Sequence, residues 1–296
     1  MSNIGIVFMK ALPFKIPKTS TDTLIVQEDK GLVFYDKLHQ HEEIQISLIV
    51  LGEGSLIVGD TITSYKANDI LIFGSHVPHV LKSSQSEIES YMISIFFTKE
   101  SFGDVFFELT EFDDMATFFN SLAYGIQVIS MKEELIDQML LIKENKNRLD
   151  RFMIFLQILK LLSEAKVQTL SSSIMKKNYS DNEGKRMADV FQLVMNDFYR
   201  DISLNEVSSI ANMTPNAFCR YFKQRTNKTF FQFLTEVRIE NSCRILSKEH
   251  DISIAEASYS SGFKNLSNFN RKFKKIKGIT PSGYRKKLQN SDFFDL

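Results

Sequence analysis

Residues 253–285 read SIAEASYSSGFKNLSNFNRKFKKIKGITPSGYR. Ser253 and Glu256 have the S-x-x-E spacing of a capping box, which begins a helix. Asn265 marks a second helix start, and the helix after it carries phenylalanines four residues apart, on one face. Two short helices joined by a tight turn form a helix-turn-helix, so this stretch predicts one such unit.

The same design occurs about fifty residues earlier, as an internal repeat. Ser203 and Glu206 form another S-x-x-E box, and Thr214 begins a second helix with proline at its first position. An arginine follows the second start by six residues in both units, as Arg220 and as Arg271. The repeat predicts two helix-turn-helix units at about 203–226 and 253–277, joined by a long helix near Phe230–Ser247.

The second helix of each unit is expected to turn phenylalanines inward and polar side chains outward. In a major groove, arginine pairs with guanine, asparagine with adenine, and lysine with phosphate. The alternative is a helical bundle with a solvated basic face. The candidate DNA-binding residues are Asn216, Ala217, Cys219, Arg220, Lys223, Ser267, Asn268, Asn270, Arg271, Lys272 and Lys275.

The charge of the chain is unevenly spread. The 296 residues contain 36 Lys+Arg and 36 Asp+Glu, which alone argues against a nucleic-acid binder. Residues 184–290, however, hold 19 basic and 9 acidic residues, a balance of +10, and the rest of the chain has −10. Such asymmetry indicates a nucleic-acid-binding domain joined to another domain, although two domains of different pI remain the alternative.

Residues 184–288 resemble the tandem helix-turn-helix domain of AraC/XylS-family transcription regulators. The second unit carries most of the resemblance, through Gly262-Phe263, Ser267, Phe269, Arg271, Phe273-Lys274-Lys275, Gly278, Thr280-Pro281 and Tyr284-Arg285. The first unit matches through Glu206-Val207, Thr214-Pro215, Phe218, Arg220, Phe222-Lys223 and Phe230. The resemblance implies a double-stranded-DNA-binding regulator, usually an activator that contacts RNA polymerase.

Three residues depart from the family pattern. Ser208 and Ser258 stand where alanine is usual, and a serine can hydrogen-bond back to a helix carbonyl. Asn227 stands where glycine is usual, and asparagine is the residue best able to replace it in a left-handed helix end. The fold is therefore expected to be kept.

The N-terminal half is predicted to contain strands followed by helices. Short apolar runs separated by turn signals predict an antiparallel barrel or sandwich, and the later periodicity is helical. The fold class is thus α+β multidomain, with an all-α C-terminal domain. The predicted strands are 24–26, 43–50, 55–58, 70–73 and 91–97, and the predicted helices are 112–122, 133–142 and 149–162.

The predicted barrel resembles, more weakly, the cupin-like ligand domain of the same family. His39, His41 and His79 could provide nitrogen ligands, and Gln45 stands about where a metal-binding cupin has glutamate. Three interpretations stay open: structural histidines, polar contacts to an organic effector, and a metal site. These four residues are the candidate ligand-binding residues, and no metal or cofactor is assigned.

The predicted organisation has three parts. They are a cupin-like domain at 1–166 (barrel about 20–100, helices about 111–165), a linker at 167–184, and a DNA-binding domain at 185–290. The helix near Phe152–Leu162 is apolar nearly all round, so it either forms a homodimer interface or lies within its own domain.

The chain is not expected to be an enzyme or a membrane protein. It has no G-x-S-x-G, P-loop, G-x-G-x-x-G or C-x-x-C motif, and the apolar run Ile4–Met9 is too short to span a bilayer. The expectation is a cytoplasmic regulator controlled by a small-molecule effector. Regulation without an effector, or a metal-dependent cupin enzyme fused to a DNA-binding module, are the alternatives.

Overall fold

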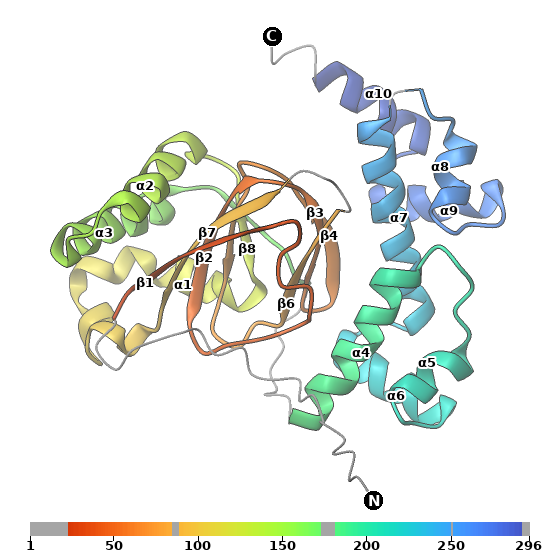
Figure 1. Cartoon of the computed structure of the whole chain (residues 1–296), viewed down its shortest axis with the longest axis horizontal. Coiled ribbons are helices and arrows are strands. Elements are labelled where there is room, and N and C mark those ends of the chain that lie inside the picture. Colours follow the sequence, from red (N-terminus) through yellow and green to blue (C-terminus); the bar gives the residue numbers. More distant parts are fainter. Residues whose placement is uncertain (1–22, 85–88, 173–180, 250, 292–296) are drawn as a thin grey trace, which may run out of the picture. The chain divides into compact units, whose positions relative to one another are not determined.

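The computed structural model describes residues 23–84, 89–172, 181–249 and 251–291 (Figure 1). The apolar run Ile4–Met9 and residues 173–180 of the predicted linker lie outside these residues. The chain divides into two compact units near Ala188. The first unit contains the strands and the second is helical, in agreement with an α+β chain whose C-terminal part is all-α.

Two antiparallel sheets form the N-terminal unit. One has six strands in the order β1-β7-β2-β5-β8-β9, and the other has three in the order β4-β3-β6. The strands are β1 (Ile25–Gly31), β2 (Ile44–Leu51), β3 (Gly54–Val58), β4 (Thr61–Tyr65), β5 (Ile70–Phe73), β6 (His79–Ser83), β7 (Ser90–Phe97), β8 (Ile126–Val128) and β9 (Val167–Thr169). The five predicted strands are present, and β4, β6, β8 and β9 were not predicted.

Strand β2 separates two layers of core. Its side chains alternate between the faces of the sheet, as the pleat requires. Ile46 and Leu48 belong to the apolar cluster that also contains buried side chains of the helices, whereas Ile49 belongs to the cluster between the sheets. Gln45 therefore points to the interior of the two-sheet structure, on the same face of β2 as Ile49.

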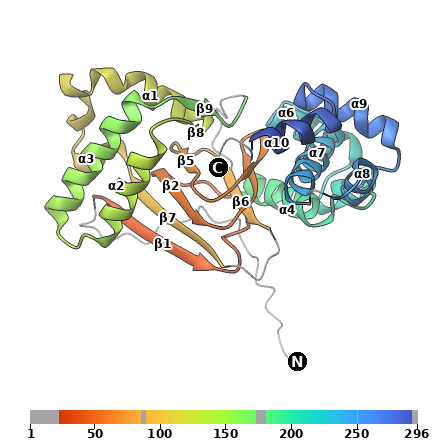
Figure 2. The ribbon, with the colours of Figure 1, turned by 90° about the horizontal axis from the view of Figure 1, so that it is seen from above.

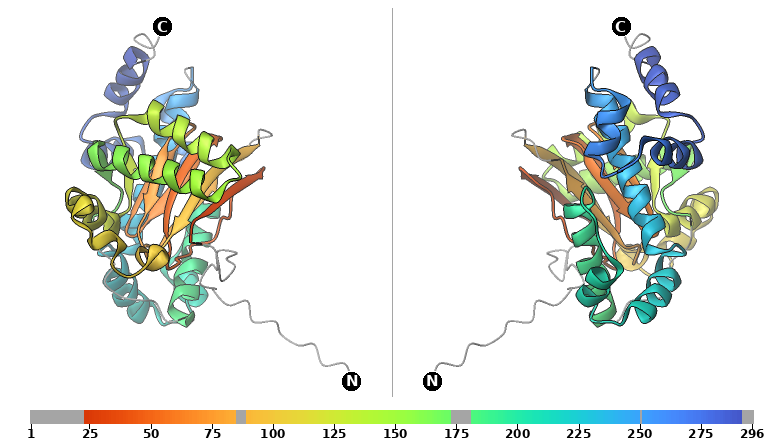
Figure 3. Two further views of the ribbon diagram at one scale, coloured as in Figure 1. Left: turned by 90° about the vertical axis from the view of Figure 1, so that its left-hand side faces the viewer. Right: turned by 90° about the vertical axis from the view of Figure 1, so that its right-hand side faces the viewer.

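Helices cover the outer face of the six-stranded sheet (Figure 3). α2 (Lys132–Glu144) and α3 (Arg148–Glu164) lie across the strands, and the segment predicted as one helix at 112–122 is a 3₁₀ turn at Thr110–Met115 followed by α1 (Ala116–Ser121). Phe155 of α3 is buried in this layer, while Met153 is 55% exposed. The inner face of α3 thus belongs to the core of its own domain.

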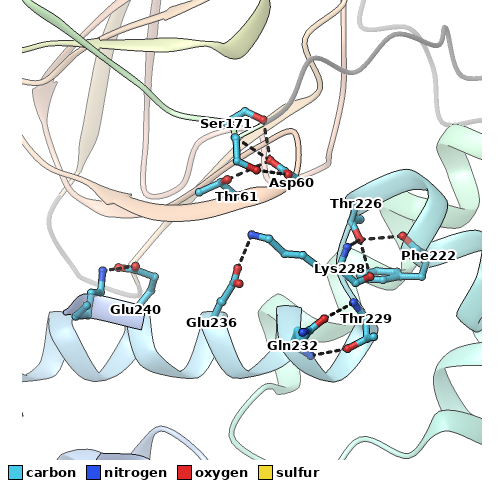
Figure 4. A network of polar contacts seen from close by, with 12 residues as sticks. Asp60, Thr61, Ser171, Phe222, Thr226, Lys228, Thr229, Gln232, Glu236 and Glu240 are labelled. Carbon is cyan, nitrogen blue, oxygen red and sulfur yellow. Dashed lines mark hydrogen bonds and ion pairs between the residues drawn. The ribbon is translucent and has the colours of Figure 1, made fainter. Parts of the chain in front are cut away.

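The predicted linker at 167–184 is wrong at both ends. Val167–Thr169 forms β9, which pairs with β8, and α4 (Asp181–Asp197) begins before the predicted linker ends. The three serines at 171–173 suggested a flexible linker, but Ser171 and Ser172 are held by hydrogen bonds to Asp60. The Ser171 hydroxyl donates to the buried Asp60 carboxylate over 2.8 Å, and the Ser172 amide donates over 3.1 Å (Figure 4).

The C-terminal unit is built around one long helix, α7 (Phe230–Lys248), as predicted from the apolar spacing (Figure 2). Phe233, Val237 and Leu246 on its inner face are buried. The helices around it are α4, α5 (Leu204–Ile210), α6 (Pro215–Thr226), α8 (Ile254–Ser260), α9 (Leu266–Lys277) and α10 (Pro281–Ser291).

Most of the predicted helix ends are confirmed. Thr214 and Asn265 are the N-caps of α6 and α9, and Ser253 forms a complete capping box with Glu256. Asn227 ends α6 in the left-handed conformation, at φ 55°. The box at Ser203 is only half formed, because its serine caps α5 while the glutamate three residues later binds Arg200 instead.

Candidate nucleic-acid interface and histidine cluster

The pairs α5–α6 and α8–α9 share one packing scheme. Phe218 and Phe222 of α6 are fully buried and lie against Phe230 of α7, with ring centroids 5.7 Å apart in both contacts. In the second unit Phe269 and Phe273 are also fully buried, with centroids 5.5 Å apart. The aromatic side chains hold the second helix of each pair by its inner face, as predicted.

The outer faces of α6 and α9 carry the predicted DNA-binding residues. Ala217 and Lys272 are half-buried. The remaining ones are exposed: Asn216, Cys219, Arg220, Lys223, Ser267, Asn268, Asn270, Arg271 and Lys275. Each helix therefore presents hydrogen-bonding and basic side chains on one surface and aromatic ones on the other, which is the arrangement that a recognition helix requires.

Arg271 is oriented by a neighbour on the same helix. Its Nη2 donates to the Asn268 side-chain oxygen over 2.9 Å. A guanidinium held in this way loses less side-chain entropy when it pairs with a base edge, and its planar fork matches guanine. Lys274, Lys275 and Lys277 add three positive charges in the last turn of the helix.

A contact that the sequence did not predict joins the end of α4, α7 and the second helix-turn-helix unit. The Arg238 guanidinium of α7 donates to the carbonyl oxygens of Phe198, over 2.7 Å, and Arg200, over 2.8 Å. Gly262, in the turn of the second helix-turn-helix unit, packs on the first of these carbonyls and on that of Tyr199: a Cβ there would lie 2.7 Å from the Phe198 oxygen and 2.8 Å from the Tyr199 oxygen. Its φ of 86° also requires glycine. Any side chain at 262 would push this junction apart.

An ion pair fixes α9 to the connecting helix. Lys277, at the end of α9, pairs with Glu240 of α7, whose side chain is only 11% exposed. Burial raises the pKa of Glu240, and Lys277 opposes that rise. Lys228, just before α7, makes a similar pair over 2.8 Å with Glu236, which lies on α7 one turn before Glu240 (Figure 4). α7 therefore has electrostatic as well as apolar contacts to its surroundings.

The four candidate ligand residues of the N-terminal unit come together. One ring nitrogen of each of His39, His41 and His79 lies within 4.8 Å of those of the other two. The Gln45 side-chain oxygen lies 3.0 Å from the Nε2 of His41 and 3.1 Å from the Nε2 of His79. Backbone pairing between residues 39 and 79 brings the H-x-H segment against β6.

Aromatic rings and burial shield His41 and His79 from water, whereas His39 is half-buried. His79 stacks on Phe73 at a centroid distance of 4.1 Å, and Phe96 meets His41 edge-on at 5.6 Å. Burial lowers the pKa of His39 to about 4, and it lowers the pKa of His41 as well. The pKa of His79 lies well below its usual value, because of burial first and the neighbouring histidines second.

A pocket of ≈ 310 Å³ lies on the other face of β2. Glu42, His76, Lys99 and Phe119 are among the residues that line it, and the Lys99 ammonium lies 4.7 Å from the centroid of the Phe119 ring. Sequence inspection had not indicated this pocket, since no motif marks it. It brings together one ammonium group, an aromatic ring and the carboxylates of Glu42 and Glu100, a mixed lining of the kind that small-molecule sites have.

Comparison with known proteins finds a family match in the C-terminal, helical part of the chain. A family model described as a helix-turn-helix domain matches residues 207–287. YdeC, an uncharacterized HTH-type transcriptional regulator of Bacillus subtilis, is 29% identical over 101 residues, 34% of this chain and 34% of that protein. YesN, an uncharacterized transcriptional regulatory protein of the same organism, is 37% identical over 76 residues, 25% of this chain and 21% of that protein. Residues 207–287 form an AraC-type helix-turn-helix domain.

The matched part of the chain covers only about a third or less of these curated relatives. A solved structure of ToxT from Vibrio cholerae O395 covers 90% of this chain and 98% of that chain, at 14% identity and a TM-score of 0.36. The AraC-type domain and its relatives among transcriptional regulators agree with the prediction that the chain is not an enzyme.

In the part of the chain that the structure describes, no helix combines the length and the apolar character needed to cross a membrane.

Proposed function

We propose that this chain is a sequence-specific transcription regulator in which α6 and α9 read two segments of DNA. The observation that carries the proposal is the duplicated design of the AraC-type domain. In each unit, two buried phenylalanines hold a short helix by one face, while asparagine, arginine and lysine side chains occupy the other. Residues 184–290 also carry the +10 balance that attracts phosphate.

The proposed division of labour follows from side-chain chemistry. Arg220 and Arg271 occupy equivalent positions, six residues after the N-caps Thr214 and Asn265. Each arginine can pair bidentately with guanine, and the lysines nearby can hold the phosphate backbone. If the two helices lie on one face of the duplex, they enter grooves about one helical turn, roughly 34 Å, apart.

We further propose that a small molecule bound to the N-terminal unit controls DNA binding, and that the regulator is a cytoplasmic homodimer that activates transcription through RNA polymerase. The support for a dimer is the exposed apolar surface of α2 and α3, where Leu141, Leu149 and Met153 are 48%, 65% and 55% exposed. The support for an organic effector is the pocket beside Lys99 and Phe119. An effector must bind the two states of the protein with different affinity to have any effect.

The experiment that tests the DNA proposal is selection of bound fragments from a random duplex pool with the full chain. We expect the enriched DNA to contain two short conserved blocks about one helical turn apart, and the affinity for it to fall steeply with salt. Enrichment of no sequence, with equal binding to all DNA, would contradict sequence-specific regulation. Control without an effector remains the second candidate, and it predicts that no small molecule changes this affinity.

A further inference from the structure

The helices α6 and α9 have the same length and the same kind of N-cap, so their residues can be compared position by position. Each helix has twelve residues. The Thr214 hydroxyl oxygen accepts from the Ala217 amide over 3.4 Å, and the Asn265 side-chain oxygen accepts from the Asn268 amide over 3.0 Å. Ala217 and Asn268 are therefore equivalent, and each lies three residues before the arginine of its helix, on the same face.

The two helices differ at this position. Asn268 offers a side-chain oxygen, and the Nη2 of Arg271 donates to it over 2.9 Å. Ala217 has only a methyl group, which cannot accept a bond from Arg220. With the residues that the structure describes, the side chain of Arg220 makes no hydrogen bond or ion pair. The guanidinium of α9 is thus held by a neighbour, whereas that of α6 is not.

The bond to Asn268 leaves Arg271 able to read a base and adds to its selectivity. The guanidinium keeps further N–H donors for the two parallel bonds to O6 and N7 of guanine. To contact another base or a phosphate, it must turn out of this plane and give up the bond to Asn268. Since selectivity is a difference between two binding free energies, a bond kept with guanine and lost with other bases increases it.

This contribution belongs to the complex with DNA rather than to the free protein. Asn268 and Arg271 are both exposed, and a hydrogen bond between exposed side chains on a helix adds little to folding stability. In a groove of DNA the two side chains lose contact with water, and a hydrogen bond is stronger in such surroundings. The effect of Asn268 should therefore appear in the choice of base and not in the free energy of unfolding.

A second difference between the helices acts in the same direction. Lys274 of α9 is equivalent to Lys223 of α6, but the next residue is Lys275 in α9 and Gln224 in α6, and all four are exposed. Contacts from lysine to phosphate fix the register of a helix along the groove. α9 has one more side chain for such contacts, which places Arg271 more firmly over its base.

We propose that Asn268 is a positioning residue for Arg271, and that α9 therefore discriminates between bases more sharply than α6, where Ala217 gives Arg220 no support. The inference rests on the proposed function, because it requires both helices to read DNA. The rival role for Asn268 is direct pairing with adenine, for which its amide is suited. The two roles differ in the base pair that a substitution of Asn268 affects.

The test uses the full chain and duplexes that carry the selected sequence or a single base-pair change in it. Discrimination is the ratio of the Kd for the changed duplex to the Kd for the selected one, and Arg271→Ala identifies the base pair that Arg271 reads. Asn268→Ala should lower discrimination at that same base pair about three- to tenfold and leave the other base pairs within about twofold. In an Arg271→Ala background the same substitution should change discrimination less than about twofold.

The matched control is Asn268→Asp, which keeps an oxygen acceptor at the same place. It should retain discrimination at the base pair of Arg271, although its negative charge weakens binding to every duplex. Ala217→Asn supplies the missing acceptor in α6 and should raise discrimination at the base pair of Arg220 about twofold or more. Circular dichroism checks that each variant is folded.

Three outcomes would overturn the positioning role. A loss by Asn268→Ala at a different base pair would show that Asn268 pairs with a base itself. Additive losses in the double variant would show that the two side chains act independently. Unchanged discrimination in Asn268→Ala would show that the bond is not kept on DNA. In all three cases a preference of the unchanged chain for the selected duplex would still support the proposed function, which fails only if that preference is absent.

Discussion

The Nε of Arg238 donates a hydrogen bond of 2.7 Å to the backbone oxygen of Phe198, forty residues earlier in the chain. The oxygen belongs to the segment just after α4, where helix carbonyls lack partners within the helix. The positive guanidinium also lies at the negative end of that helix. One side chain of α7 therefore completes the end of α4 beside the turn of the second helix-turn-helix unit.

Arg238→Ala should lower the free energy of unfolding of the DNA-binding unit by about 2–3 kcal/mol, because two charge-assisted hydrogen bonds to backbone oxygens are lost. Urea unfolding of the full chain, followed by circular dichroism at helix wavelengths, measures the loss. Arg244→Ala is the control on the same helix and should cost less than about 1 kcal/mol, because Arg244 donates to the side-chain oxygen of Asn241 on its own helix rather than to backbone oxygens of another segment. Equal losses for both variants would contradict the special role of Arg238.

Ser258→Ala should stabilise the protein by about 1 kcal/mol. Among the described residues, the hydroxyl of Ser258 is buried without a hydrogen-bond partner, contrary to the predicted bond to a helix carbonyl. Ser208 does make that bond, to the Asn205 oxygen over 3.0 Å, so Ser208→Ala should be neutral or slightly destabilising. The melting temperature should therefore rise for Ser258→Ala and stay the same or fall slightly for Ser208→Ala, and a decrease for Ser258→Ala would refute the prediction.

Arg271→Ala and Arg220→Ala should each cost about 1–3 kcal/mol in binding to selected DNA and relax the preference at one position. Titration of labelled duplexes at fixed salt measures both effects. Lys160→Ala removes one exposed positive charge from α3 and should leave the affinity unchanged. If the arginine variants lose as much affinity for random DNA as for selected DNA, these side chains contact phosphate alone.

Loss of the Glu240–Lys277 pair in a Lys277→Met variant should make the free energy of unfolding depend on pH. Burial raises the pKa of Glu240 in the folded protein above its unfolded value, and loss of Lys277 raises it further. The ionised carboxylate then destabilises the fold, a penalty that is absent at low pH and grows as the pH rises through the folded pKa. We expect a loss of about 2 kcal/mol at pH 8 and clearly less at pH 5.

Denaturant unfolding at both pH values measures this difference. Cys243 lies near the pair, but burial raises the pKa of its thiol to about 12, so it stays protonated throughout. Glu240→Gln with Lys277→Met serves as the control, since it removes the titrating group. A Lys277→Met loss that is equal at pH 5 and pH 8 would show that the pair contributes through packing alone.

Local features of the fold could be predicted from the sequence because they depend on neighbouring residues. The N-caps Thr214 and Asn265 and the paired phenylalanines determine where α6 and α9 begin and which face is buried. Long-range contacts could not be predicted in this way. Glu206 has the spacing of a capping box, yet Arg200 takes its carboxylate, and the partners of Arg238 lie about forty residues away.

The same limit applies to the N-terminal unit. β9 is three residues long and precedes a run of serines, so its composition is that of a linker, and only pairing with β8 reveals it as a strand. The H-x-H spacing and a third histidine did indicate a cluster. The position of Gln45 suggested a missing carboxylate, whereas its orientation toward His41 and His79 follows from the hydroxyls of β2 and β7, which no spacing along the chain reveals.

Asp60 fixes the position of Ser171 and Ser172, the last residues that the structure describes before α4. Its carboxylate, completely buried in the turn between β3 and β4, holds both the side chain of Ser171 and the backbone of Ser172. The chain after β9 is therefore held by a turn between two other strands as well as by the pairing of β9 with β8. A displacement of that turn would therefore displace Ser171 and Ser172 with it, although they lie more than a hundred residues later in the chain.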